Sequence, residues 1–504
     1  MARWTRRPFV PPLAVGVVAV VVYASWVARP GVWRDEAVTL AVCRRSVHQI
    51  VDLIRTENAD LVHLVYYLIV HLVMTVNDSI AAVRLLSVAA FALTAVMLVL
   101  IGRRLGSVAL GTLAGLILVI CPLASRYAQE ARPAALTTLA VTVSTYVLLG
   151  AIGEPGRRRR WLLYGLTVLI ITLVNVLALL VLLVHAILVL VAVNRLRRVA
   201  GQDARLLALG WLTSVLMACT VAAPFLVATY GQRDQVSWLE VPPLGELSNF
   251  FVLEFASAAV LVAGITAGIV VLLVYRGLPA GPEGTALVLG VCWAALPPVV
   301  LWGVSQVHPL WDLHYVVFTL PGTALALSSV TLLLGRRLAQ VRRLPVLQAV
   351  VAAITLILLT GLSWQSQVGY RQPLREPETE DVFAVGAYLA DHAKPGDGVL
   401  FLPGHLRVLA QEDPTNFPAL RDLALESSAL DSATMTGWES EPADIAERVG
   451  QMNQIWLVAD AFPAEPQGPE DEAKIKALAA GFRRVQSADV TTLHVDLWVR
   501  APGR

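Results

Sequence analysis

Two short polar segments lie next to long apolar stretches in the first third of the sequence, and the first of them carries adjacent acids. Asp35 and Glu36 lie in residues 31–37, directly after the first long apolar stretch. Carboxylates so near hydrocarbon are costly unless they are solvated or used. One carboxylate can deprotonate a hydroxyl group while its neighbour orients it or holds a cation. Alternatively, both acids mark a solvated helix start, where the helix dipole favours negative charge.

The second polar segment, residues 125–133, lies between two apolar stretches. Its polar side chains are those of Ser125, Arg126, Tyr127, Gln129, Glu130 and Arg132. A guanidinium group binds phosphate through two parallel hydrogen bonds, which suits a phosphorylated ligand. Pro133 suits the first turn of the next helix. In the alternative interpretation, Arg126 snorkels to the membrane surface and Arg132 pairs with Glu130.

Other polar positions accompany these two segments. Arg84 begins an apolar stretch, where a charge is expensive and is usually paired or functional. It can meet the phosphate of a lipid carrier or pair with Asp78. A later polar cluster is made of His308, Asp312, His314 and Tyr315. Its spacing permits a metal site, although outer-loop histidines are more often surface groups.

The composition places these residues in a membrane protein. The chain has 504 residues, of which 57% are hydrophobic and 15% charged, and its mean hydropathy is +0.66. Soluble proteins carry about 25% charged residues. Four cysteines (Cys43, Cys121, Cys219 and Cys292) lie far apart without CxxC spacing, which argues against a zinc site or disulfide framework. The arginine runs are separated by whole apolar stretches, which argues against nucleic-acid binding.

Eleven apolar stretches are long enough to cross a bilayer. The predicted spans are 12–28, 84–101, 107–124, 133–152, 161–174, 176–193, 206–230, 257–275, 285–304, 315–334 and 345–363. The first is interpreted as a retained span rather than a cleaved signal peptide. The tightest hairpin lies at Asn175.

The arginine runs set the topology. If the short apolar stretch 61–76 does not cross, the runs between spans face one side, together with Arg3, Arg6 and Arg7. If it did cross, the strongest runs would lie outside, against the positive-inside rule. We therefore predict a helix at headgroup level over 61–76, which includes His63. The N-terminus is then cytoplasmic and the C-terminus is outside.

The sequence after Trp364 has the composition of a soluble domain. Pro373 and Pro377 mark a linker, and residues 395–398 are predicted to form a turn. Helices are expected at 381–392 and 470–480, and strands at 399–402, 454–458 and 491–499. We therefore divide the chain into a membrane domain of residues 1–368 and an α/β extracytoplasmic domain of residues 369–504, without a glycine-rich phosphate loop.

The two polar segments resemble the outer-loop motifs of GT-C glycosyltransferases. Arg34-Asp35-Glu36-Ala37 and residues 126–133 match them, nearest to family 39, which includes protein O-mannosyltransferases and bacterial relatives. The aromatic pair Tyr66-Tyr67 and the Arg84-Leu85-Leu86-Ser87 start of span two follow the same order. The resemblance covers residues 10–155, and later spans match only in pattern. It implies a GT-C-like polytopic α-helical membrane protein with interfacial helices in the first outer loop.

The resemblance also implies roles for individual residues. Asp35 would act as base on the acceptor, Glu36 would support it, and Glu130 would be the acid of the second loop. Arg84 would hold the donor phosphate, and Arg132 matches the same motif. The supporting residues would be Tyr127, Gln129, His63 and His314.

The implied reaction is inverting transfer of a sugar from a polyprenyl-phosphate donor to an acceptor hydroxyl group. Mannose is one candidate sugar, and the acceptor would be a glycan, lipid or protein. The reaction would take place on the outer face of the plasma membrane, in cell-envelope glycan or glycoprotein synthesis. A divalent cation, Mg²⁺ or Mn²⁺, is compatible with the acidic pair, and no other cofactor is indicated.

The main alternative is a membrane transporter of a lipid or small solute. Transporters place ionisable groups near the midplane of the membrane. Here the predicted spans are nearly free of charge, and the acids gather in loops on one side. A receptor or scaffold would explain the outer domain but not Arg84, and a lipid-linked polymer ligase would not be expected to carry this acidic first loop.

Overall fold

The computed structural model describes residues 9–57, 60–197, 201–374, 381–413, 417, 420–460 and 466–502. Arg3, Arg6, Arg7 and Pro377, which contribute to the predicted topology and linker, lie outside these residues. Contacts within the chain divide it into two compact units. The helical unit comprises residues 1–27, 61–66 and 84–370, and the α/β unit comprises residues 28–60, 67–83 and 371–504.

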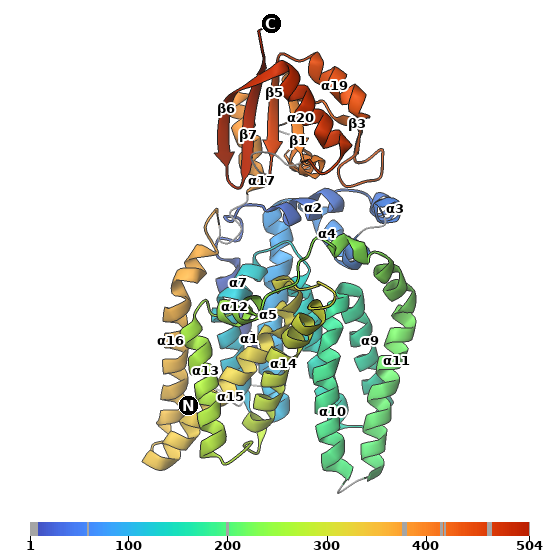
Figure 1. The fold of residues 1–504 in the computed structure, drawn as a ribbon. Coiled ribbons are helices and arrows are strands. Elements are labelled where there is room, and N and C mark those ends of the chain that lie inside the picture. Colours follow the sequence, from blue (N-terminus) through green and yellow to red (C-terminus); the bar gives the residue numbers. More distant parts are fainter. Residues whose placement is uncertain are drawn as a thin grey trace. The chain divides into compact units, whose positions relative to one another are not determined.

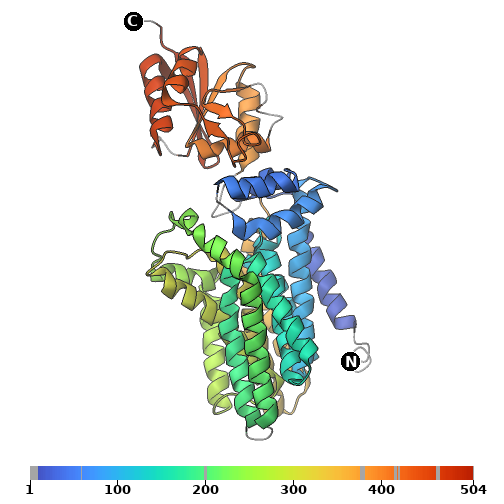
Figure 2. The ribbon, with the colours of Figure 1, turned by 90° about the vertical axis from the view of Figure 1, so that its right-hand side faces the viewer.

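The helical unit is a bundle of long apolar helices that run side by side (Figures 1 and 2). Its long helices are α1 (Val10–Ala24), α5 (Ile80–Leu105), α6 (Val108–Ile120), α8 (Ala134–Gly153), α9 (Arg158–Val174), α10 (Val181–Arg197), α11 (Gly201–Gly231), α13 (Ala258–Val274), α14 (Pro282–Ser305), α15 (Leu320–Arg342) and α16 (Val346–Gly369). Each of the eleven predicted spans therefore contains a helix. The hairpin at Asn175 is also present, since α9 ends at Val174 and the Asn175 side chain caps the next short helix.

By length and composition, seven helices in the described part of the chain can cross a membrane, or up to nine if each bent pair counts as one span. The two bent pairs are α6 with α7 (Pro122–Ala128), at 69°, and α12 (Leu244–Leu253) with α13, at 87°. Helices α1 and α9 have 15 and 17 residues, fewer than the 20 to 31 residues of these seven. The chain is thus a multi-pass membrane protein, and the count of eleven spans stays a prediction.

Close helix contacts in the bundle depend on small residues. A Cβ atom added to Gly102 of α5 would lie 2.3 Å from the backbone nitrogen of Gly111 in α6. One added to Gly290 of α14 would lie 2.5 Å from the backbone nitrogen of Ala326 in α15. Small residues let membrane helices approach closely, where van der Waals packing replaces the hydrophobic effect.

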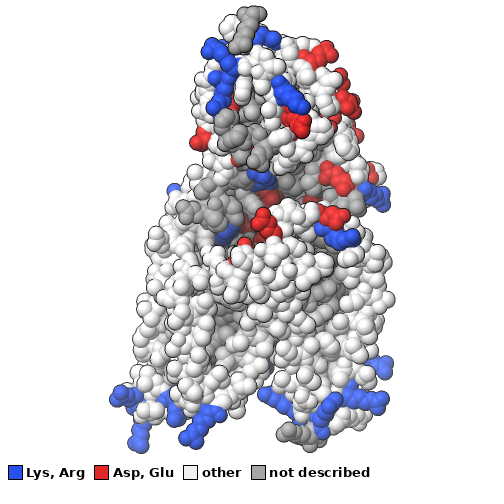
Figure 3. All heavy atoms as spheres, viewed as in Figure 1, with Lys and Arg blue, Asp and Glu red and all other residues white. Residues whose placement is uncertain are grey.

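Charge is sorted along the helical unit. Arginines occupy the last turns of α5, α10 and α15 and the first turn of α9, and Figure 3 shows them gathered at one end of the unit. The flanks carry exposed apolar side chains, such as Leu273 at 71% and Ile357 at 70% exposure. This pattern fits a lipid-facing surface with one basic rim.

A five-stranded sheet forms the centre of the α/β unit, in the order β2-β1-β5-β7-β6 (Figure 1). The strands of this sheet are β1 (Gly398–Leu402), β2 (Arg421–Asp422), β5 (Gln454–Ala459), β6 (Phe482–Val490) and β7 (Leu493–Arg500). Strand β1 pairs in parallel with β2 and β5, whereas β7 is antiparallel to β5 and β6. A separate two-stranded sheet pairs β3 (Leu425–Ser427) with β4 (Trp438–Glu439).

The helices of this unit are α17 (Val382–His392), α18 (Val408–Glu412), α19 (Pro442–Gly450) and α20 (Pro469–Gly481). Leu400 and Leu402 of β1 share a core with Ile445 of α19 and Leu478 of α20, so these two helices cover one face of the sheet. The predicted α/β class is confirmed, as are the helices at 381–392 and 470–480. The first arm of the β6–β7 hairpin and helix α19 were not predicted.

The first loop of the chain is built into the α/β unit. It forms α2 (Arg34–Cys43), α3 (Val47–Glu57) and, after a short 3-10 turn, α4 (Leu64–Met74), whose later residues belong to this unit. The Val382 backbone N–H donates to the Val32 carbonyl at 2.8 Å, and Arg34 pairs with Asp460 at 2.8 Å. The unit boundary at Tyr370 lies close to the predicted domain limit, but residues 28–60 and 67–83 join the C-terminal fold.

A buried ion network holds the α/β unit together. Lys474 is completely buried, and its ammonium group donates to the Phe401 carbonyl at 3.0 Å and to Glu439 and Asp471, each at 2.8 Å. Glu439 also accepts a hydrogen bond from Arg407, at 2.8 Å. Removal of one partner from such a network leaves buried charge uncompensated, which is strongly destabilising.

We expect Lys474→Met to lower the free energy of unfolding of the α/β unit by about 3–5 kcal/mol. The matched control is Lys476→Met, because Lys476 is 77% exposed and pairs with Glu472 at the surface. Such a pair contributes about 0–1 kcal/mol. Chemical denaturation of the purified full chain, followed by tryptophan fluorescence, measures both. Equal losses in the two variants would contradict the structural role of the network.

Candidate functional site

The second polar segment begins at a sharp bend between α6 and α7. Cys121 has an extended backbone, with φ −67° and ψ 117°, and Pro122 takes the first position of α7. A residue before proline is pushed out of the helical region, so α6 ends here and the chain turns by 69°. The bend places residues 125–130 inside the helical unit, where all six are buried.

A buried ion pair lies at the centre of this segment. The Arg126 Nε atom donates to Oε1 of Glu130 at 3.2 Å, and the two side chains are 5% and 1% exposed. The Arg126 guanidinium also lies 5.5 Å from the ring centre of Tyr127 and 5.8 Å from that of Tyr370. The interpretation in which Arg126 snorkels to the membrane surface is therefore wrong, because its charge is neutralised within the protein.

Two neighbouring side chains attach the segment to α1 and α5. The Gln129 amide donates to the carbonyls of Tyr23 at 2.8 Å and Ser25 at 2.7 Å, beside the end of α1. The Ser87 hydroxyl of α5 donates to the Glu130 carbonyl at 2.6 Å. These bonds fix the backbone of the segment, and they also satisfy carbonyls at the end of a helix.

Arg84 joins the same cluster from α5. Its side chain is completely buried and donates to the Val27 carbonyl at 3.1 Å. Ser87, one turn later on α5, contacts Glu130. Arg84, Gln129 and Glu130 are therefore brought together near the end of α1, whereas their roles stay a prediction.

Arg132 belongs to a second polar group in the helical unit. It acts electrostatically on Asp312, which lies in the loop between α14 and α15. His314 pairs with Asp312, Nδ1 to Oδ1, at 2.6 Å, and its ring lies 4.1 Å from that of Tyr315. Burial tends to raise the pKa of Asp312, but its bonds with His314 and the charge of Arg132 outweigh burial and lower the pKa. The Asp312 carboxylate is therefore held ionised.

An apolar cavity of about 730 Å³ adjoins these residues within the helical unit. Pro133, directly after the second polar segment, lines it together with His63, Tyr315 and His308. The rest of its wall comes from the end of α11 and the residues around Asn175. Its volume is that of a small-molecule site, for which about 300–1,000 Å³ is usual.

Asp35 and Glu36 occupy the first turn of α2, in the α/β unit. Glu36 is completely buried, whereas Asp35 is partly exposed. A solvated helix start would account for Asp35 but does not describe Glu36, because a buried carboxylate needs compensation within the protein. The acids therefore belong to a different unit from Arg84, Glu130 and Arg132.

Within the described ranges, no group of three or more His, Cys, Asp and Glu side chains could hold a metal ion. Cys43, Cys121, Cys219 and Cys292 are free thiols.

Glu254 was not predicted from the sequence. It is a buried acid between α12 and α13 that accepts a hydrogen bond from Thr323 at 3.0 Å. Its only signal was a single acid between two apolar stretches.

No family model and no curated protein matches this sequence. Solved structures do match its fold. ArnT from Cupriavidus metallidurans in the apo state aligns with a TM-score of 0.59 at 12% identity, over 96% of this chain and 97% of that one. ArnT is a GT-C glycosyltransferase. The chain has a GT-C fold.

Two further structures support the GT-C fold. ArnT bound to undecaprenyl phosphate aligns with a TM-score of 0.51 at 12% identity, over 96% and 97% of the two chains. The Archaeoglobus fulgidus oligosaccharyltransferase tethered to an acceptor peptide aligns with a TM-score of 0.50 at 8% identity, over 91% of this chain and 70% of that one. The GT-C prediction is thus confirmed for the fold, and membership of family 39 stays a prediction.

If the Arg126–Glu130 pair organises the second loop of this GT-C fold, a double-mutant cycle will detect it. We expect Arg126→Gln and Glu130→Gln to show a coupling energy of about 1–3 kcal/mol, because both groups are buried. The control cycle uses Arg157 and Glu154, whose side chains are 71% and 42% exposed, and should give less than about 1 kcal/mol. Unfolding in detergent supplies the energies, and additive effects in the first cycle would refute the role.

Proposed function

We propose that this protein is an inverting glycosyltransferase that uses a polyprenyl-phosphate sugar. The observation that carries the proposal is a GT-C fold over nearly the whole chain, with a buried arginine, Arg126, and a buried carboxylate, Glu130, in its second polar segment. Buried ionisable groups of this kind are expensive in a membrane protein and usually mark a functional site. A transporter interpretation has no comparable support from the fold.

The donor is assigned to the helical unit. Its apolar cavity of about 730 Å³ suits part of a polyprenyl chain, which reaches the site sideways from the bilayer. Arg84 and Arg132 would hold the phosphate, because guanidinium groups bind phosphate oxygens in pairs. One matching ArnT structure contains undecaprenyl phosphate, which supports a ligand of this class here.

The reaction is a direct displacement at the anomeric carbon. Asp35 takes the proton of the acceptor hydroxyl group, and the oxygen attacks the anomeric carbon of the donor sugar. The bond between that carbon and the phosphate oxygen breaks, and polyprenyl phosphate leaves with the bonding electrons. Glu36 supports the base, and the arginines stabilise the phosphate charge that develops on the leaving group.

The cellular location is proposed from the resemblance to GT-C glycosyltransferases. The basic rim of the helical unit would face the cytoplasm, so that the reaction takes place on the outer face of the plasma membrane. Mannose is the first sugar to test, with a protein, glycan or lipid as acceptor. His63, Tyr127, Gln129 and His314 would shape the site, and assays should compare Mg²⁺, Mn²⁺ and a chelator.

We expect Asp35→Asn to abolish release of free polyprenyl phosphate from a panel of polyprenyl-phosphate sugars, because the amide cannot accept the proton. General-base catalysis contributes about 10²–10⁴-fold to such rates. The matched control is Asp52→Asn in the same loop, whose carboxylate is 37% exposed and pairs at the surface with His48. This variant should keep the wild-type rate.

Turnover of one sugar by the wild type and by Asp52→Asn alone would establish the class and the donor together. Full turnover by Asp35→Asn would remove its assigned role. If well-folded wild type turned over no donor with any acceptor, but carried a solute into proteoliposomes, the transferase proposal would be replaced by the transporter alternative.

The donor cavity makes a separate prediction. Leu226→Trp would fill part of the cavity from α11, so we expect a rise of at least tenfold in the KM for the lipid donor with little change in stability. Val227→Trp is the control, because Val227 is 73% exposed on the same helix and does not line the cavity. A lipid donor that binds equally well to both variants would place the donor elsewhere.

A further inference from the structure

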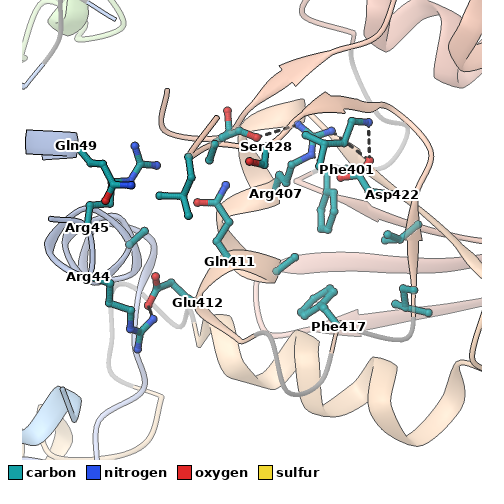
Figure 4. A pocket seen from close by; sticks show the side chains of 18 residues that line it. Arg44, Arg45, Gln49, Phe401, Arg407, Gln411, Glu412, Phe417, Asp422 and Ser428 are labelled. Atoms are coloured by element: carbon teal, nitrogen blue, oxygen red, sulfur yellow. Dashed lines mark hydrogen bonds and ion pairs between the residues drawn. The ribbon is translucent and has the colours of Figure 1, made fainter. Parts of the chain in front are cut away.

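A second cavity lies wholly within the α/β unit and has no part in the proposed transfer reaction. Its volume is about 460 Å³, within the range of small-molecule sites. Arg44 and Arg45, directly after α2, form one wall, and residues of β1, α18 and β2 form the other (Figure 4). The first loop and the C-terminal domain therefore build this cavity together.

The charges around the cavity are balanced. Arg44 pairs with Glu412 at 2.5 Å, and Arg407 pairs with Asp422 at 2.5 Å. Arg45 donates to the Thr434 carbonyl at 2.7 Å. Because Arg44 and Arg407 pair with carboxylates and the charge of Glu57 acts on Arg45, each of these positive charges has an acidic counterpart, and a neutral ligand suits the cavity better than a phosphate.

Hydrogen-bonding capacity remains at two adjacent residues of α18. The Gln411 amide makes no hydrogen bond to any residue that the structure describes, and Figure 4 shows it extending into the cavity. Glu412 is only 4% exposed, and its Oε1 atom has no hydrogen-bond partner among the described residues. An amide and a carboxyl group that line the same cavity can bind hydroxyl groups of one ligand, because a hydroxyl group is both a donor and an acceptor.

The protonation of Glu412 agrees with this use. Burial raises its pKa to about 7, although the charge and hydrogen bond of Arg44 oppose the rise. Near neutral pH the carboxyl group can therefore accept a hydrogen bond or donate one. A hydroxyl group can satisfy it in either state.

Aromatic and aliphatic side chains line the rest of the cavity. The rings of Phe401 and Phe417 have centres 6.1 Å apart at an angle of 41°, and Val399 lies near Phe401 on β1. Such a wall suits the C–H face of a sugar ring. Gln411 and Glu412 could then bind the hydroxyl groups at the edge of that sugar. Ligand sites typically combine a largely apolar wall with a few polar groups of this kind.

We propose that this cavity is a binding site for a neutral saccharide, formed jointly by α2 and the C-terminal domain. The site is separate from the donor cavity of the helical unit. Its walls are held by the Arg44–Glu412 pair and by the Lys474 network, through Arg407, so the cavity is preorganised for its ligand.

Saturation-transfer NMR and calorimetry on the purified full chain in detergent test this proposal without any transferase assay. The probes are neutral hexoses, pentoses and N-acetylhexosamines with their disaccharides, and inorganic phosphate is the contrast. Gln411→Ala should weaken saccharide binding roughly threefold to tenfold, the effect of one lost hydrogen bond. Gln451→Ala is the control, because that amide bonds Glu447 at the surface of α19.

Saturable binding of a neutral saccharide that is weakened by Gln411→Ala and kept by Gln451→Ala supports the proposal. Glu412→Gln provides an independent variant of nearly equal size, and thermal unfolding confirms that each variant is folded. The proposal is overturned if no saccharide in the panel binds the wild type, if phosphate binds in place of sugars, or if Gln411→Ala binds as tightly as wild type. Any of these results leaves the transferase proposal standing.

Discussion

The buried pair of Arg126 and Glu130 is the interaction on which the second loop of the helical unit depends. A proline bend turns α6 into α7 and carries polar side chains into the bundle, where each charge must be compensated. The pair neutralises two of those charges. Gln129 and Ser87 then bond the adjoining backbone to α1 and α5. Arg84 is buried against the same end of α1. The Arg126–Glu130 ion pair and the bonds around it therefore position several of the candidate site residues.

The same constraint accounts for what could be predicted from the sequence. Hydrocarbon requires long apolar helices and confines arginines to their ends, so composition and charge placement were enough to locate a helix in all eleven predicted spans. Residues 125–133 were recognisable as a candidate site because polar residues between two such helices are costly to bury unless they serve a function. The partner of Glu130 was not predictable, because both Arg126 and Arg132 lie within reach along the chain. Only the bend at Cys121 directs Arg126 inward.

The parts that were missed depend on contacts without a local signal. Strand β6 is exposed at most of its positions and carries Arg483 and Arg484, so its sequence lacks the apolar alternation that predicts a strand. The first loop joins the C-terminal fold through ion pairs between residues that are hundreds of positions apart, such as Arg34 with Asp460. Ion pairs of this kind cannot be predicted from the sequence, because the two residues come close only after the sheet has formed and its loops lie at one edge.

This joint construction gives the α/β unit a role in the proposed chemistry. Asp35 and Glu36 lie on α2, and the two residues that follow this helix hold its end: Arg44 pairs with Glu412, and Arg45 donates to the Thr434 carbonyl. A helix of ten residues has little stability alone, so these contacts decide its position. The C-terminal domain is therefore a support for the acidic first loop, whatever ligand it binds. Its buried Lys474 network joins α20 to β1 and reaches the cavity wall through Glu439 and Arg407, so it stabilises that support.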